Sequence, residues 1–136
     1  MPFLIKSPVS NPRAASFAFA KARVMYGGKA VREGDEIFVF ASETSGGSGL
    51  IARGVVTAVK AHARPRGAAR WTPRVSITVR RTALAKRPLG RAQLKAWRGR
   101  RDGSPQAELD FKFYRQATDK LGGISDAAAK FLRGFF

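Results

Sequence analysis

Two short apolar runs separated by a glycine-rich linker set the strongest limit on how this chain can fold. The stretch Glu33–Glu43 makes a turn at Gly34-Asp35 and continues with β-branched and aromatic residues, a composition typical of a buried strand. A second apolar run covers Leu50–Val59. Residues 44–49 between them are small or polar, so the backbone can turn freely there. We therefore expect two central strands joined by a loop that a ligand could approach closely.

Two further segments are predicted to be strands. Phe3–Lys6 is a short apolar segment that ends before Ser7-Pro8, as expected of a first or edge strand. Val75–Arg81 alternates apolar and polar residues, so we expect its apolar face to be buried and its polar face to point outward. Between the central strands and this one, residues 61–72 contain proline and glycine and lack periodicity, which favours a loop.

Two segments in the first hundred residues favour helices. Residues 14–26 are rich in alanine and end at Gly27-Gly28, so we expect a helix there, although Phe17 and Phe19 alternate as they would in a strand. Residues 91–98 are predicted to form a short basic helix, because their two large apolar residues lie three apart on one face.

The last third of the chain leaves one choice open. Residues 108–114 alternate as in a strand, but Ser104-Pro105 is a good helix start, with a capping serine and a first-turn proline. Both interpretations are compatible with the sequence. Ser125 is a clear N-cap for a helix over residues 126–133, whose large apolar residues we expect to pack on the sheet.

Length and pattern together indicate the fold class. At 136 residues the chain is expected to form one domain, residues 1–136, with a sizeable core. Its loops are too short for βαβ crossovers, which favours an α+β fold: a small mixed or antiparallel, partly closed β-barrel with short helices at its ends. Cysteine, a signal-peptide pattern and a membrane-length apolar run are all absent from the sequence. We therefore expect a cytoplasmic protein with no membrane partner.

Charge is the strongest global feature. The chain carries 26 lysines and arginines against 9 acidic residues, a net charge of +17. No acidic residue lies between Glu43 and Asp102, whereas 15 basic residues do. Such a one-signed block attracts polyanions and makes their binding depend on salt. A merely solvated surface usually mixes both signs, so contact with nucleic acid is the favoured interpretation.

Groups that could perform catalysis are scarce. His62 is the only histidine, and we expect it to be an exposed loop residue. Without cysteine or a second histidine, nucleophile–base triads and His/Cys metal sets are excluded by count. Asp35, Glu36 or Glu43 could supply a carboxylate pair, but Asp35 is more simply explained as a turn residue that bonds nearby backbone. An enzyme is therefore the less favoured interpretation, and no metal or cofactor is expected.

Aromatic residues beside basic ones are better suited to binding. Four of them lie in or next to basic segments, namely Tyr26, Trp71, Trp97 and Tyr114. An aromatic face next to arginine or lysine can stack a base while the cation holds its phosphate. The spacing of Trp97 favours a core position instead. Trp71, in a loop with arginines on both sides, is the better candidate for stacking.

Several stretches fit the pattern of one known kind of domain. Residues 34–42 place Gly-Asp before an aromatic-rich run that ends in serine, and residues 50–59 follow as a second strand. Tyr114-Arg115-Gln116 and residues 121–125 supply an Arg-Gln segment and a strand-to-helix ending, with a further, weaker likeness at Lys6-Ser7-Pro8. Together these features resemble the EVE domains of the PUA-like superfamily.

The resemblance implies a small β-barrel that binds nucleic acid and holds a modified or flipped base. The family's Trp-Gly-Val-Arg-Asn stretch is absent, and residues 24–29 stand in its place, so the resemblance does not say which base would be recognised. We expect Ser42 and nearby backbone to read the base edge, with Tyr26 or Trp71 stacking on it. The expected base pocket comprises Lys6, Ser7, Tyr26, Gly27, Ser42, Glu43, Trp71, Tyr114, Arg115 and Gln116.

The basic block is expected to hold the flanking phosphates. Its candidate residues are Arg53, Arg70, Arg74, Arg80, Arg81, Lys86 and Arg87. Two other interpretations stay open on the sequence. One is a PUA-like enzyme acting on a modified nucleoside, with Glu43 or Asp35 as acid or base. The other is a basic accessory protein that binds RNA or a ribosomal particle without reading any base.

Overall fold

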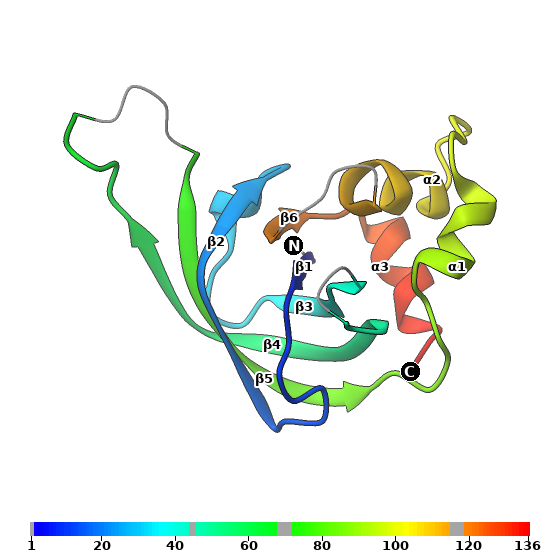
Figure 1. The fold of residues 1–136 in the computed structure, drawn as a ribbon, viewed down its shortest axis with the longest axis horizontal. Coiled ribbons are helices and arrows are strands. Elements are labelled where there is room, and N and C mark those ends of the chain that lie inside the picture. Colours follow the sequence, from blue (N-terminus) through cyan, green and yellow to red (C-terminus); the bar gives the residue numbers. More distant parts are fainter. Residues whose placement is uncertain (1, 44–45, 68–71, 115–118) are drawn as a thin grey trace.

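In the part of the chain that the structure describes, six strands close into a mixed β-barrel, with helices gathered on one side (Figure 1). This computed structural model describes residues 2–43, 46–67, 72–114 and 119–136. The strands are β1 Phe3–Ser7, β2 Ser16–Met25, β3 Glu36–Ala41, β4 Gly49–His62, β5 Arg74–Leu84 and β6 Lys120–Gly123. The expected mixed barrel of an α+β fold is confirmed, and its ring of strands is fully closed.

The first strand, β1, closes the barrel because it is paired along both edges. It runs parallel to β3, with Lys6 opposite Phe40, and antiparallel to β6, with Lys6 opposite Lys120. The order around the ring is β1-β3-β4-β5-β2-β6. The two predicted central strands are confirmed as β3 and β4, and the alternating segment after them is confirmed as β5.

A long hairpin of β4 and β5 extends beyond the ring of strands, away from the helices (Figure 1). Its pairing runs out to His62 opposite Arg74. The loop predicted from residue 61 onward was therefore wrong at its start, because Ala61 and His62 continue the β4 ladder. His62 is a strand residue, and its Nε2 lies 2.7 Å from Ser76 Oγ on β5.

The helix predicted over residues 14–26 is wrong, because most of this segment is strand β2. Phe17 and Phe19 are each 6 % exposed and belong to the barrel core, whereas the alanines next to them face solvent. Burial of the two rings outweighs the helix propensity of alanine. The strand bulges between Phe19 and Ala22, where Lys21 takes a positive φ of 51°.

Short helical elements fill the rest of the fold. They are η1 Gly28–Ala30, α1 Arg91–Leu94, η3 Lys95–Trp97, α2 Pro105–Leu109, the π-helical η4 Asp110–Tyr114 and α3 Asp126–Arg133. The basic helix expected over residues 91–98 is confirmed as α1 and η3, and residues 108–114 are helical. Ser125 caps α3 as predicted, its Oγ accepting a hydrogen bond from Ala128 N at 3.1 Å. None of the helices in the described ranges has the length and apolar character that crossing a membrane requires.

Alternate residues of the strands serve two separate apolar cores. The core inside the barrel includes Phe3, Ile5, Ile37, Val39 and Leu121. The core between barrel and helices includes Leu4, Phe38, Leu109, Phe113 and Leu132. Because β1 and β3 are buried on both faces, their sequences are continuous apolar runs. Trp97 packs on the second core as predicted, with its ring 5.6 Å from that of Phe131.

Glu36, at the start of β3, ties the last helix to the barrel. Its carboxylate accepts hydrogen bonds from Arg133 of α3 at 2.6 and 3.0 Å and from Arg53 of β4 at 2.8 Å. The hydrogen bond from Arg133 is the main cause that lowers the pKa of Glu36, against the opposing effect of burial. One carboxylate therefore joins two cations that are distant in sequence.

The packing of α3 on the barrel gives a first prediction. Leu132 is fully buried in the second core, so Leu132→Ala should lower the free energy of unfolding by about 2–5 kcal/mol. Lys130→Ala in the same helix is the matched control, because Lys130 is exposed and should change stability by less than about 0.5 kcal/mol. Urea unfolding followed by circular dichroism measures both. Equal effects of the two substitutions would contradict the assignment of α3 to the core.

Candidate functional site

The most unusual feature of the fold is a pair of buried lysines where β1 meets β6. Lys6 and Lys120 are directly opposite each other in this antiparallel pair. Lys6 is 5 % exposed and Lys120 is 1 % exposed. Their chain neighbours Ile5 and Leu121 point into the barrel core, so the two lysines point to the opposite face, toward the helices.

The aromatic ring and backbone of Phe113 face the two ammonium groups. Lys6 Nζ donates a hydrogen bond to Phe113 O at 2.9 Å, and Lys120 Nζ lies 5.7 Å from the centre of the Phe113 ring. Burial lowers the pKa of Lys120 to about 8, with repulsion from Lys6 and Arg23 adding to the effect. The pKa of Lys6 is lowered by burial and by Arg91, while Glu43 acts in the opposite direction. The site concentrates positive charge where water has little access.

An aromatic wall continues outward from the lysine pair. The ring of Tyr26 lies 6.5 Å from the rings of both Phe111 and Phe113, measured between centres. Lys112 Nζ lies 5.3 Å from the centre of the Tyr26 ring. Gly122 of β6 faces the wall, and a Cβ there would come within 3.2 Å of the Phe113 ring. A glycine at this position therefore allows the rings to approach the strand closely.

A left-handed turn carries Tyr26 into the wall. Tyr26 has a φ of 50° and Gly27 a φ of 79°, so the chain reverses directly after β2. Tyr26 O accepts a hydrogen bond from Gly123 N at 3.1 Å, which fixes the turn against β6. A positive φ is uncommon for a residue other than glycine, and such strain is often found at functional positions.

The parallel pairing of β1 with β3 brings the polar residues at their ends together. Ser42 N donates a hydrogen bond to Ser7 O at 3.0 Å, and Ser42 is 5 % exposed. Glu43 follows, and its Oε1 accepts a hydrogen bond from Arg91 N at 2.5 Å. This end of the two strands also carries Lys6, so four of the residues predicted for the base pocket cluster here.

Of the remaining pocket candidates, three lie in the described part of the chain and three lie outside it. Tyr26 and Gly27 directly follow β2, whose pairing with β6 sets Met25 opposite Gly122, so that Tyr26 lies beside Gly123. Tyr114 ends the π-helical segment. Trp71, Arg115 and Gln116, like Arg70 of the phosphate set, lie outside the described residues, so their assignments stay predictions.

No motif in the sequence pointed directly to Lys120, Phe111 or Phe113. Lys120 stands immediately before the Leu121-Gly122-Gly123 stretch that resembles the EVE ending, and this position was the only available signal. Its pairing with Lys6 depends on a strand register across more than a hundred residues. The aromatic wall likewise depends on the turn at Tyr26, which the helix prediction for this segment concealed.

The predicted phosphate-binding residues in the described part of the chain lie on β4, on β5 and in the segment after β5. Most of them contact other groups of the protein. Arg53 forms an ion pair with Glu36 at 2.7 Å, Arg74 donates to Lys21 O at 3.0 Å, and Arg81 donates to Arg13 O at 2.7 Å. Arg87 donates to Gly134 O at 2.7 Å and lies over the Phe135 ring. Arg80 and Lys86 are exposed. A guanidinium has five N–H donors, so one internal bond leaves others for a phosphate.

The carboxylates proposed for catalysis have structural contacts. Asp35 Oδ2 accepts a hydrogen bond from Arg32 N at 2.8 Å, as predicted for a turn residue. Glu43 receives the Arg91 N–H described above. Within the described ranges, no group of three or more His, Asp or Glu side chains is arranged to hold a metal ion.

The fold is similar to that of several solved structures, although the sequence itself has no match among family models or curated proteins. Among solved structures, the DUF55 domain of human thymocyte nuclear protein 1 is similar with a TM-score of 0.67 and 14 % identity, covering 98 % of this chain and 97 % of that one. A Pseudomonas putida protein is similar with a TM-score of 0.65 and 17 % identity, covering 99 % of each chain.

A further similar structure is the human THYN1 protein in complex with 5-methylcytosine containing DNA. Its TM-score is 0.63 at 14 % identity, and the match covers 98 % of this chain and 95 % of that one. These likenesses extend over nearly the whole chain in each case. The protein therefore has the fold of the DUF55 structures along its length.

The buried lysine pair predicts an unusual dependence of stability on pH. In the unfolded chain Lys120 titrates near its ordinary pKa of 10.5, but in the fold its pKa is about 8. Between these values the unfolded state binds a proton that the folded state lacks, so the free energy of unfolding rises with pH, on the order of 1–3 kcal/mol in total. Below pH 8 both states are protonated and this contribution is constant.

Unfolding by urea at a series of pH values from 7 to 10.5 measures the effect. Lys120→Met should flatten the curve, whereas Lys130→Met, at an exposed position, should leave it unchanged. Identical slopes for wild type and Lys120→Met would show that Lys120 does not carry the pH dependence.

Proposed function

We propose that this protein binds nucleic acid and holds a modified or flipped base beside the Lys6–Lys120 pair, as a member of the EVE family. The observation that carries the proposal is the placement of two buried cations next to an aromatic wall in a chain of net charge +17. The human THYN1 structure supports it, because that protein has the same fold and is in complex with 5-methylcytosine containing DNA.

The chemistry of a flipped base matches the groups that meet here. A base taken out of its stack needs an aromatic surface in exchange and hydrogen bonds to its edge. Tyr26, which is half-buried and has the Phe113 ring 6.5 Å from its own between ring centres, offers such a surface. A lysine ammonium is a donor only, so Lys6 and Lys120 would pair with acceptor atoms of a base edge or of its phosphate. Ser42 remains our candidate for reading the edge.

Phosphates on either side of the base are assigned to the exposed cations of β5 and the segment after it. Phosphate contacts position a protein on nucleic acid without reading sequence, and they make the affinity fall as salt rises. Arg80 and Lys86 are exposed and therefore suited to this role. Arg53 is less suited, because its guanidinium already forms an ion pair with Glu36.

Base recognition is tested by binding matched oligonucleotides that carry cytosine or 5-methylcytosine, at about 50 and 200 mM salt. We expect a preference for one base that survives the higher salt. Tyr26→Leu should weaken the preferred complex about fivefold or more, since stacking contributes about 1–3 kcal/mol per base, while Tyr26→Phe keeps the ring and should retain the preference. Other modified bases and RNA form the second panel. Equal binding to every oligonucleotide, lost at 200 mM salt, would leave a basic accessory protein as the better interpretation.

Phosphate binding is tested by comparing two arginines with different surroundings. Arg80→Ala should weaken binding to all sequences alike and reduce the slope of log affinity against log salt by about one unit. Arg53→Ala removes the same charge at a position that is paired with Glu36, so its effect on the slope should be clearly smaller. The opposite order of the two slopes would assign the phosphate contact to Arg53.

A further inference from the structure

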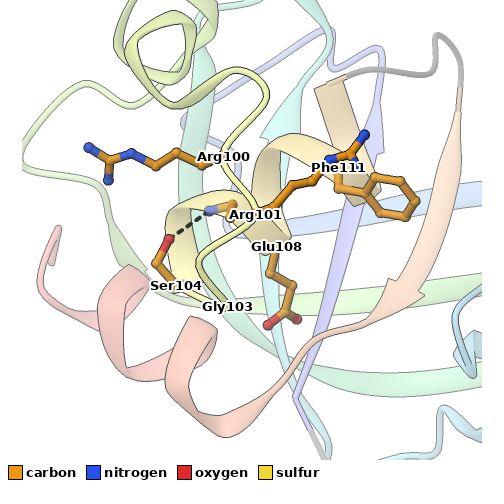
Figure 2. Close-up of a pocket in the computed structure, with 7 residues that line it drawn as sticks. Arg100, Arg101, Gly103, Ser104, Glu108 and Phe111 are labelled. Carbon is orange, nitrogen blue, oxygen red and sulfur yellow. Dashed lines mark hydrogen bonds between the residues drawn. The ribbon is translucent and has the colours of Figure 1, made fainter.

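A hollow lies between the loop after η3 and the helical pair α2–η4 (Figure 2). Its volume is about 450 Å³. Two arginines, one carboxylate, one aromatic ring and three small residues line it: Arg100, Arg101, Gly103, Ser104, Ala107, Glu108 and Phe111. It is separate from the lysine pair but borders the aromatic wall, because Phe111 belongs to both.

Phe111 is far more exposed to solvent than the other large apolar residues of its helical segment. It is 54 % exposed, whereas Leu109 and Phe113 in the same helical segment are each 1 % exposed. Among the large apolar side chains in the described ranges, only Val59 is also classed as exposed, at 36 %. A single exposed apolar residue is ordinary, but this ring lies 6.5 Å from the Tyr26 ring and so extends the wall into the hollow.

The charges around the hollow favour an anionic ligand. Arg100 and Arg101 are both exposed, and Figure 2 shows Arg101 extending to the same side as Phe111 while Arg100 points the other way. Glu108 is engaged by Lys112 Nζ at 3.2 Å and by the Ser125 N–H at 2.8 Å. Burial alone would raise the pKa of Glu108, but these hydrogen bonds lower it, so its charge is compensated within the protein.

Asp102 is the other carboxylate close to this loop, and it too has a partner. Its Oδ1 accepts a hydrogen bond from Ser104 N at 3.0 Å. Hydrogen bonds from Ser104 are the largest cause that lowers the pKa of Asp102, and the charge of Arg100 lowers it further. With Lys112 opposite Glu108, the cations in and around the hollow outnumber the carboxylates.

We propose that this hollow binds the nucleotide next to the base held at the lysine pair. Phe111 stacks on the base of that nucleotide, and Arg101, which extends to the same side as Phe111, holds its outer phosphate. An exposed ring flanked by arginines is the arrangement with which proteins bind unpaired nucleotides. Because consecutive nucleotides share one short backbone, a base beside Tyr26 brings its neighbour within reach of Phe111. This inference rests on the proposed function and specifies its second contact.

The test uses single-stranded oligonucleotides with 5-methylcytosine and a photoreactive 5-iodouracil on either side of it, so that the flanking base is unpaired. For wild type we expect an ultraviolet cross-link to Phe111, mapped by mass spectrometry, from one of the two flanking positions. Phe111→Ala should remove this cross-link and weaken binding about tenfold, while Phe111→Tyr should keep both. Phe111→Leu, which keeps apolar bulk without a ring, should behave as Phe111→Ala. Thermal unfolding of these variants should match wild type, because the ring is largely exposed.

Two arginine variants separate a local contact from general charge. Arg101→Ala should reduce the salt slope by about one unit and weaken the cross-link. Arg32→Ala removes the same charge at an exposed position outside both proposed contacts, and it should leave the cross-link unchanged.

The two proposals fail in different ways. If wild type prefers a modified base but Phe111→Ala binds within twofold of wild type, or the cross-links map elsewhere, the second contact is overturned and the base site stands. If wild type shows no preference between plain and modified bases, the proposed function fails. A cross-link to Phe111 that the alanine variant abolishes would still establish the hollow as a nucleotide contact.

Discussion

The fold and its candidate site both depend on the pairing of β1 along its two edges. β1 lies between β3, about thirty residues further along the sequence, and β6 from its last fifth, so closing the barrel joins both ends of the chain. The register of this closure sets Lys6 against Lys120. The strand cannot slip by one residue, because Phe3 and Ile5 would then leave the barrel core. The charged pair is thus a direct result of how the barrel closes.

The groups around Lys6 and Lys120 offset part of the cost of burying two positive charges where the barrel closes. Lys6 donates to a backbone carbonyl, and both lysines contact Phe113, whose ring attracts a cation through its electron-rich face. Glu43, at the end of β3, acts on Lys6 in the favourable direction. The elements that relieve the charge are the same ones that form the aromatic wall and the polar strand ends. The residues that stabilise the closed barrel are therefore also those of the proposed binding surface.

Segments with a strong local pattern were predictable from the sequence. The continuous apolar runs of β3 and β4, the alternation of β5 and the serine cap of α3 each follow from nearby residues alone. The β2 segment was not, because its alanines favour a helix and only the contact of Phe17 and Phe19 with the barrel core decides for a strand. In the candidate site, the resemblance predicted Lys6, Ser7 and Ser42, whereas Lys120 and Phe113, which lie beside them in the structure, were not predicted. Their roles come from a register and a turn that no local window contains.

The desolvated lysines also have a meaning for how such a protein can change over evolutionary time. An apolar residue at position 120 would remove a repulsion from the fold, so random substitution is expected to find more stable variants easily. Each of them would also remove a donor from the candidate site. Keeping two like charges side by side in a place of low water access then represents a trade-off, in which the empty protein stays less stable than its framework permits. Binding of an anionic or acceptor-rich ligand would offset part of the repulsion between Lys6 and Lys120, so that occupancy and folding reinforce each other.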